Sequence, residues 1–335
     1  MVSLFKTKSA SAVVWITLLC VFVHLPFIFQ GPQVVLSGKD TVLDTLLANF
    51  SRASGIVLYL SYLIIVSLQA NRLNAAANNL FLFQKENALA GMVYVLFTAL
   101  LPQWNNISSS LIINTLFIEM LATFRILHTV DKTEKLVFNL SLFSGVGVVL
   151  YPPSLVWTLV LFFLLTSLSS FNFRLIIVWL IGLLLPFYFL AAYLFLNDYF
   201  LKEKIGVLWR FLPEISLQGY ARLQDPIICL VAFGFIVLTV LIGILSGAQN
   251  SGKLVISARK VWGLSTFAFL LTTGTAFLFP KESMQVLLSS IVPAALLGAN
   301  TFYYSSAKWL VNLWFWLMLL GIYYTNLHVL QIIRF

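Results

Sequence analysis

Two pairs of charged residues have the types and spacing that chemistry on a phosphorylated substrate needs. Asp40 and Asp44 lie one helical turn apart in one polar segment, and Arg210 and Arg222 lie in another. If the two segments meet, a carboxylate could act as a general base while the guanidinium groups bind a phosphate. The alternative is structural: Asp40 caps a helix, and the arginines are solvated loop charges.

Glu119 is a third candidate, because it lies inside the apolar stretch 116–120. A charge at the centre of a bilayer costs about 2.5–3.5 kcal/mol on insertion scales, so an acid there is a functional hypothesis. The alternatives are that Glu119 is protonated, or that it pairs with Arg125 or a neighbouring asparagine. We expect Glu119 to be nearly alone as a buried polar group.

Other chemistries lack a supporting motif. The chain has no glycine-rich phosphate loop, H-E-x-x-H, C-x-x-C or G-x-S-x-G pattern. Its two cysteines and three histidines are scattered, so we expect neither a metal site nor a cofactor. The Lys and Arg residues form no basic stripe, and nucleic acid is therefore not an expected partner.

The elements that position these residues are predicted to be membrane helices. The chain is 61% hydrophobic and only 9% charged, with a mean hydropathy of +0.98. A soluble domain carries about 25% charged residues. We therefore predict an all-α, polytopic transmembrane helix bundle forming a single integral membrane domain over residues 1–335. About eleven apolar runs approach the ~20 residues of a crossing: 12–29, 53–70, 86–103, 109–127, 136–151, 153–170, 174–197, 226–246, 262–280, 284–300 and 307–326.

The distribution of positive charge predicts an orientation. With the N-terminus inside, 12 Lys and Arg residues fall in cytoplasmic segments and 8 in outer segments. Two outer segments exceed a simple turn. Apolar residues recur at helical spacing in 38–51, which predicts an amphipathic interfacial helix, and 198–225 forms a long loop. Tyr151-Pro152-Pro153 predicts a tight turn between helices, because proline disfavours helix there.

Several apolar and aromatic signatures carry a resemblance over nearly the whole chain. They include 94–102, 121–125, Phe138-Asn139-Leu140-Ser141, 150–153, Phe171-Asn172-Phe173-Arg174 and 182–187. In these stretches the chain resembles a family of inner-membrane proteins of Bacteroidetes-type bacteria classed as a domain of unknown function.

The arrangement is also similar to that of membrane-embedded glycosyltransferases of the GT-C type, which use polyprenyl-phosphate-linked sugars. Those enzymes share an inside N-terminus, a first outer loop with an interfacial helix and a later tight hairpin. Their first outer loop carries an essential acid. The resemblance implies that Asp40 or Asp44 takes this role here.

Three functions stay open, and whether the chain is an enzyme stays open with them. The first is transfer of a polyprenyl-phosphate-linked sugar at the outer face of the bacterial inner membrane. The second is a non-catalytic membrane subunit of a cell-envelope assembly or secretion complex, with other membrane subunits as partners. The third is a transporter, placed last because we find no internal repeat and few buried polar groups.

Overall fold

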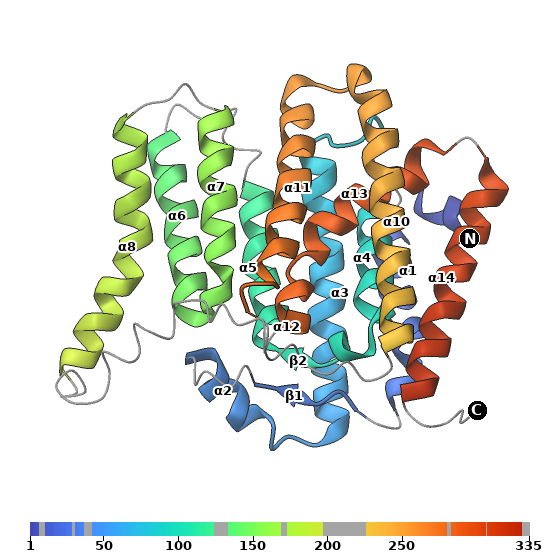
Figure 1. Ribbon diagram of the computed structural model, residues 1–335, viewed down its shortest axis with the longest axis horizontal. Coiled ribbons are helices and arrows are strands. Elements are labelled where there is room, and N and C mark those ends of the chain that lie inside the picture. The colour runs from blue at the N-terminus through green and yellow to red at the C-terminus, as the bar shows by residue number, and fades with distance from the viewer. Residues whose placement is uncertain are drawn as a thin grey trace.

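The computed structural model describes residues 1–6, 11–28, 31–36, 42–123, 133–168, 173–196, 226–279, 283–305 and 307–329. Within these ranges the chain is mostly helical, which confirms the all-α prediction (Figure 1). The α-helices are α1 (Ser11–His24), α2 (Val42–Phe50), α3 (Gly55–Asn79), α4 (Leu89–Leu100), α5 (Ser109–Thr123), α6 (Thr133–Leu150), α7 (Leu155–Leu168), α8 (Phe173–Leu196), α10 (Pro226–Asn250), α11 (Ile256–Thr275), α12 (Ser283–Leu288), α13 (Ile291–Tyr304) and α14 (Lys308–Val329).

Short turns and one small ladder connect these helices. The 3₁₀ turns are η1 (Val2–Phe5), η2 (Leu25–Ile28), η3 (Pro102–Trp104), η5 (Pro152–Ser154) and η6 (Ser251–Lys253). Turn η5 lies between α6 and α7, which confirms the predicted tight turn at the proline pair. Strands β1 (Val34–Val35) and β2 (Ile107–Ser108) form a parallel two-stranded ladder.

Each of the eleven apolar runs overlaps at least one helix within the described residues, but the number of membrane crossings stays a prediction. Run 284–300 divides into α12 and α13. Five segments among the described residues are long and apolar enough to cross a membrane: Ser11–Ile28, Gly55–Asn79, Phe173–Tyr193, Cys229–Lys253 and Lys308–Leu327. The other helices are shorter or less apolar.

Helix α4 forms the centre of the bundle. All of its residues are buried, because α1, α3, α13 and α14 pack around it. With a rise of 1.5 Å per residue, its 12 residues extend roughly 18 Å, well short of a ~30 Å hydrocarbon core. Helix α13 packs against α4 and is also buried along almost its whole length. Two inner helices are therefore enclosed by longer outer ones.

Helices α10 and α13 pack closely because glycine removes the side chain at their contact. Gly243 and Gly247 lie four residues apart on α10, and a Cβ atom at Gly243 would overlap the backbone carbonyl of Leu297. The close approach lets the Thr301 hydroxyl donate a hydrogen bond of 2.7 Å to the Thr239 carbonyl. Small residues at this spacing are a common means of close packing between apolar helices.

Positive charge gathers at one end of the bundle, which we call the basic end. Here α3 and α10 finish and α6, α8, α11 and α14 begin (Figure 1). Burial and the neighbouring Lys308 ammonium lower the pKa of Lys6. Of the Lys and Arg residues in the described ranges, only Arg52 lies in the cap, and the others lie in the turns of the basic end or in the helices that begin or end there: Lys6, Arg72, Lys85, Lys135, Arg174, Lys253, Arg259, Lys260 and Lys308.

The opposite end carries a cap, which we define as residues 31–36 and 42–54. Strand β1 of the cap pairs with β2, so that Val34 lies beside Ile107. The Gln33 N–H donates a hydrogen bond of 2.9 Å to the Asn106 side chain. Helix α2 contacts β1, α5 and α6. The predicted helix within 38–51 is therefore confirmed over Val42–Phe50, while its position at a membrane interface stays a prediction.

Replacing Gly243 by alanine should destabilise the protein. The added methyl group would overlap the Leu297 carbonyl, and such overpacking costs about 1–3 kcal/mol. Gly234→Ala in the same helix is the matched control, because nothing lies within 4 Å of its Cβ position. Thermal unfolding of the detergent-solubilised protein measures both variants. Equal unfolding midpoints would contradict the close α10–α13 contact.

Candidate functional site

Asp44 is the one residue of the predicted Asp–Arg site that lies within the described part of the chain. Its side chain is only 4% exposed, and its Oδ1 accepts a hydrogen bond of 2.9 Å from the Ser109 hydroxyl. Asp40, Arg210 and Arg222 lie outside the described residues, so their contact with Asp44 stays a prediction. The structure thus shows one carboxylate of the cap held in place against the bundle.

Helix α2 places Asp44 against the start of α5. Leu43 and Leu47 are buried, whereas Leu46 is exposed, so one side of α2 faces the bundle. Ser109, which donates to Asp44, is the first residue of α5. The first backbone N–H groups of a helix have no partner within it, and they favour a nearby negative charge. This position suits an ionised carboxylate.

Four polar side chains form a buried hydrogen-bonded chain below the cap, which we call the His24–Asn326 chain. The Tyr62 hydroxyl lies 3.2 Å from Asn105 Oδ1 and 3.3 Å from His24 Nε2. Asn105 Nδ2 donates to Asn326 Oδ1 at 3.2 Å. His24 Nδ1 lies 2.8 Å from the Cys20 carbonyl. Because a carbonyl only accepts, Nδ1 carries the proton, and the single Tyr62 hydroxyl proton is shared between two acceptors, His24 Nε2 and Asn105 Oδ1.

The His24–Asn326 chain joins segments that are far apart in the sequence. His24 ends α1, Tyr62 lies in α3, Asn105 follows η3, and Asn326 lies in α14. Asn105 also lies four residues before Ser109, the hydrogen-bond donor to Asp44. The chain therefore holds the short segment between η3 and α5, and with it the partner of the candidate carboxylate.

A second buried polar cluster lies nearer the middle of α3. The Tyr94 hydroxyl donates to Gln69 Oε1 at 2.7 Å. The Gln69 amide in turn donates to the Thr115 hydroxyl at 2.8 Å. Asn114, next to Thr115, donates to the Leu288 carbonyl at 3.1 Å. This cluster connects α3, α4, α5 and α12.

The expectation that Glu119 is nearly alone as a buried polar group is wrong. Sequence reasoning missed the others because each is a neutral amide or imidazole, and most of them lie singly inside an apolar run, which leaves the local hydropathy high. A lone Asn or Gln in such a run was the available signal. The buried side chains of this kind include His24, Gln69, Asn87, Asn105, Asn114, Asn300 and Asn326.

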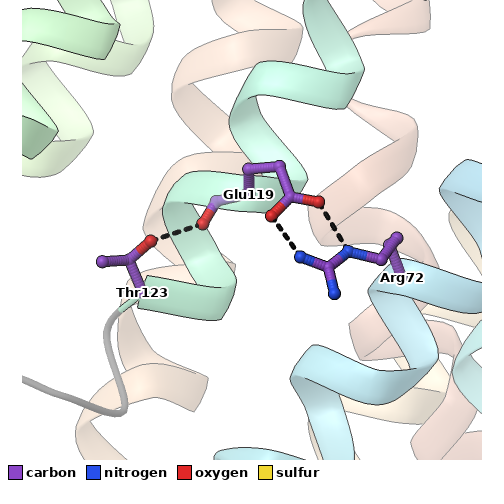
Figure 2. Close-up of polar contacts among 3 residues, drawn as sticks. All are labelled: Arg72, Glu119 and Thr123. Carbon is purple, nitrogen blue, oxygen red and sulfur yellow. Dashed lines mark hydrogen bonds and ion pairs between the residues drawn. The ribbon is translucent and has the colours of Figure 1, made fainter.

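Glu119 forms an ion pair with Arg72 (Figure 2). Arg72 Nε and Nη2 donate to the two carboxylate oxygens at 2.6 and 2.5 Å, which joins α3 to α5. The side chains of Arg72 and Glu119 are 56% and 43% exposed. Arg125, the partner considered from sequence, lies outside the described residues. Glu119 is therefore a paired charge at the surface of the bundle.

The chain matches no protein-family model and no curated protein. The resemblance to the Bacteroidetes-type family and to GT-C-type glycosyltransferases stays a prediction that rests on the sequence signatures. Among the described residues, no three His, Cys, Asp or Glu side chains are placed to hold a metal ion. The candidate site is therefore defined by geometry: a buried carboxylate, its Ser109 donor and the polar chain that holds this donor's segment.

Replacing Tyr62 by phenylalanine should destabilise the protein by about 1–3 kcal/mol. The change leaves His24 Nε2 and Asn105 Oδ1 buried without the hydroxyl between them. Tyr59→Phe is the control on the same helix, because the buried Tyr59 hydroxyl has no partner among the described residues. We expect the control to change stability by less than about 0.5 kcal/mol. Chemical unfolding in detergent measures both, and equal effects would contradict a role for the chain.

A double-mutant cycle on Arg72 and Glu119 should give a coupling energy of about 1–2 kcal/mol, near the upper limit for polar contacts between membrane helices. We expect this strong coupling because Arg72 and Glu119 form a bidentate contact with two hydrogen bonds. The control pair is Arg174 and Glu134, an ion pair with Nε and Oε1 2.9 Å apart and with a more exposed arginine. It should couple by less than about 1 kcal/mol. Unfolding free energies in bicelles supply both cycles. A weaker Arg72–Glu119 coupling than that of the control would refute the expectation.

Proposed function

We propose that this chain is a multi-pass protein of a bacterial inner membrane, with about eleven membrane-embedded helices and an inside N-terminus. Five long apolar helices and the helical structure of all eleven runs support the proposal. So does the basic end, because Lys and Arg favour the cytoplasmic side of membrane proteins. On this orientation the cap lies at the outer face.

Transfer of a sugar from a polyprenyl-phosphate-linked donor is the activity that the geometry supports best. The observation that carries this proposal is Asp44, a buried carboxylate on helix α2 of the proposed outer cap, oriented by Ser109 at the start of α5. A donor of this kind keeps its polyprenyl tail in the bilayer and its sugar at the interface. It would therefore present the sugar at the level of the cap.

In the proposed reaction Asp44 is the general base. The acceptor hydroxyl gives its proton to the carboxylate as its oxygen attacks the anomeric carbon of the donor sugar. The bond between that carbon and the phosphate oxygen breaks, and polyprenyl phosphate leaves with the bonding electrons. Arg210 and Arg222 are the proposed ligands of this phosphate, since guanidinium groups bind phosphate through paired hydrogen bonds. Asp40 is the alternative base.

Replacing Asp44 by asparagine should lower sugar transfer by about 10²–10⁴-fold, the usual contribution of a general base. The assay uses purified protein in proteoliposomes, a panel of polyprenyl-phosphate-linked hexoses and pentoses with labelled sugars, and lipid-linked and peptidoglycan acceptors. The thermal unfolding midpoint of the variant should stay within a few degrees of the wild type, because asparagine keeps the shape and can still accept from Ser109.

Glu134→Gln is the control, since this acid pairs with Arg174 at the basic end, away from the proposed site. It should transfer sugar at the wild-type rate. Transfer unaffected by both Asp44→Asn and Asp40→Asn would refute the base assignment. Absence of any transfer by the wild type across the panel would refute the activity itself.

A further inference from the structure

The break between α12 and α13 has a physical cause in the sequence. Pro293 is the third residue of α13, and its ring would clash with the carbonyl of residue 289 in a continuous helix. The helix therefore ends at Leu288 and restarts after Ser289 and Ser290, both of which are buried. Their hydroxyls donate to carbonyls one turn back, at 2.6 and 2.7 Å. A broken helix thus lies inside the bundle.

Helix α5 has two unpaired oxygens near this break, one of them on a residue that contacts it. Asn114 is fully buried, and its Nδ2 donates to the Leu288 carbonyl at 3.1 Å. Because that carbonyl only accepts, the amide nitrogen must face it, and Oδ1 is left as a free acceptor. Ser110 is buried one turn earlier on α5. Neither Asn114 Oδ1 nor Ser110 Oγ has a hydrogen-bond partner among the described residues.

Two further unpaired oxygens belong to glutamine side chains of α12 and η3. Gln285 lies one turn before Leu288 on α12, and its Nε2 donates to the Gln103 carbonyl at 3.4 Å. The Gln103 amide nitrogen lies 3.3 Å from Cys229 Sγ. The Oε1 atoms of Gln103 and Gln285 are both buried without a partner in the described part of the chain.

The four oxygens belong to one region of the bundle. Helix α12 packs on α5 and on η3. Trp104 Nε1 of η3 donates a hydrogen bond of 2.7 Å to the Met284 carbonyl of α12. Both α5 and α12 begin beside the segment 102–108, so they run in the same direction. Ser110 and Gln285 therefore lie on the same side of the Asn114–Leu288 contact, each one turn away from it.

Unpaired acceptors inside an apolar bundle are costly, and four together call for a ligand that offers positive charge. All four are neutral oxygens, the donor type that hard cations prefer. The desolvation cost of an ion rises with the square of its charge, so a site without a carboxylate favours a single charge. We propose that Gln103, Ser110, Asn114 and Gln285 bind a monovalent cation, Na⁺, where α5, α12 and η3 meet, next to the α12–α13 break. This site is independent of the proposed sugar transfer.

The test is the ion dependence of thermal stability, measured by tryptophan fluorescence on the full chain in detergent, with no sugar substrate present. A ligand that binds only the folded state raises the unfolding midpoint. We expect 150 mM NaCl to raise it by roughly 3 °C or more relative to 150 mM choline chloride. KCl at the same concentration should have a smaller effect, and equal effects of NaCl and KCl would overturn the assignment of Na⁺.

Ser110→Ala removes one oxygen and should raise the half-saturating Na⁺ concentration at least about fivefold, the equivalent of one lost contact. Asn114→Leu should abolish the Na⁺ effect if the variant folds. Ser144→Ala is the matched control, because the Ser144 hydroxyl is also buried and unpaired among the described residues but lies on α6. It should leave the Na⁺ dependence unchanged.

Equal unfolding midpoints in sodium, potassium and choline chloride would overturn the proposal. Water molecules would then be the hydrogen-bond partners of the four oxygens. An Na⁺ effect of the same size in Ser110→Ala, Ser144→Ala and the wild type would also overturn it, because the ion would then bind elsewhere. Neither result depends on whether Asp44→Asn affects sugar transfer. Failure of this proposal and failure of the proposed function are therefore distinguishable.

Discussion

Polar groups inside an apolar bundle must find partners within the protein, and this constraint shapes the whole structure. The start of α4 shows how it is met. The Leu89 N–H, unpaired within its own helix, donates to Asn87 Oδ1 at 3.0 Å. The Asn87 carbonyl accepts from the amides of Asn74 and Asn78 at 3.0 and 2.8 Å. Asparagines of α3 therefore allow a short inner helix to begin deep in the bundle.

The same constraint organises the cap end, where hydrogen bonds of the His24–Asn326 chain link four segments. Asp44 depends on this arrangement, because its donor Ser109 follows the segment that Asn105 holds. The buried amides also remove one of the two reasons for placing transport last among the possible functions. The other reason, the lack of an internal repeat in the sequence, still stands.

The helices could be predicted from sequence because a run of about 20 apolar residues is a strong signal. The inner position of α4 could not, since hydropathy is the same for a residue that faces lipid and one that faces protein. The break in run 284–300 had a readable signal, Pro293. Asp44 was a candidate from its type and position, whereas Ser109 lies 65 residues away and becomes its partner only through packing. Arg72 and Glu119 meet for the same reason.

The enclosed position of α4 has a consequence for biogenesis. A segment too short to span the bilayer cannot partition into it as an independent unit, so α4 must enter together with a longer neighbour such as α3. Its partner α13 is synthesised roughly 190 residues later. Until then, one side of α4 remains uncovered by its final neighbour. The nascent chain therefore passes through an intermediate that depends on lipid or the insertion machinery for shielding.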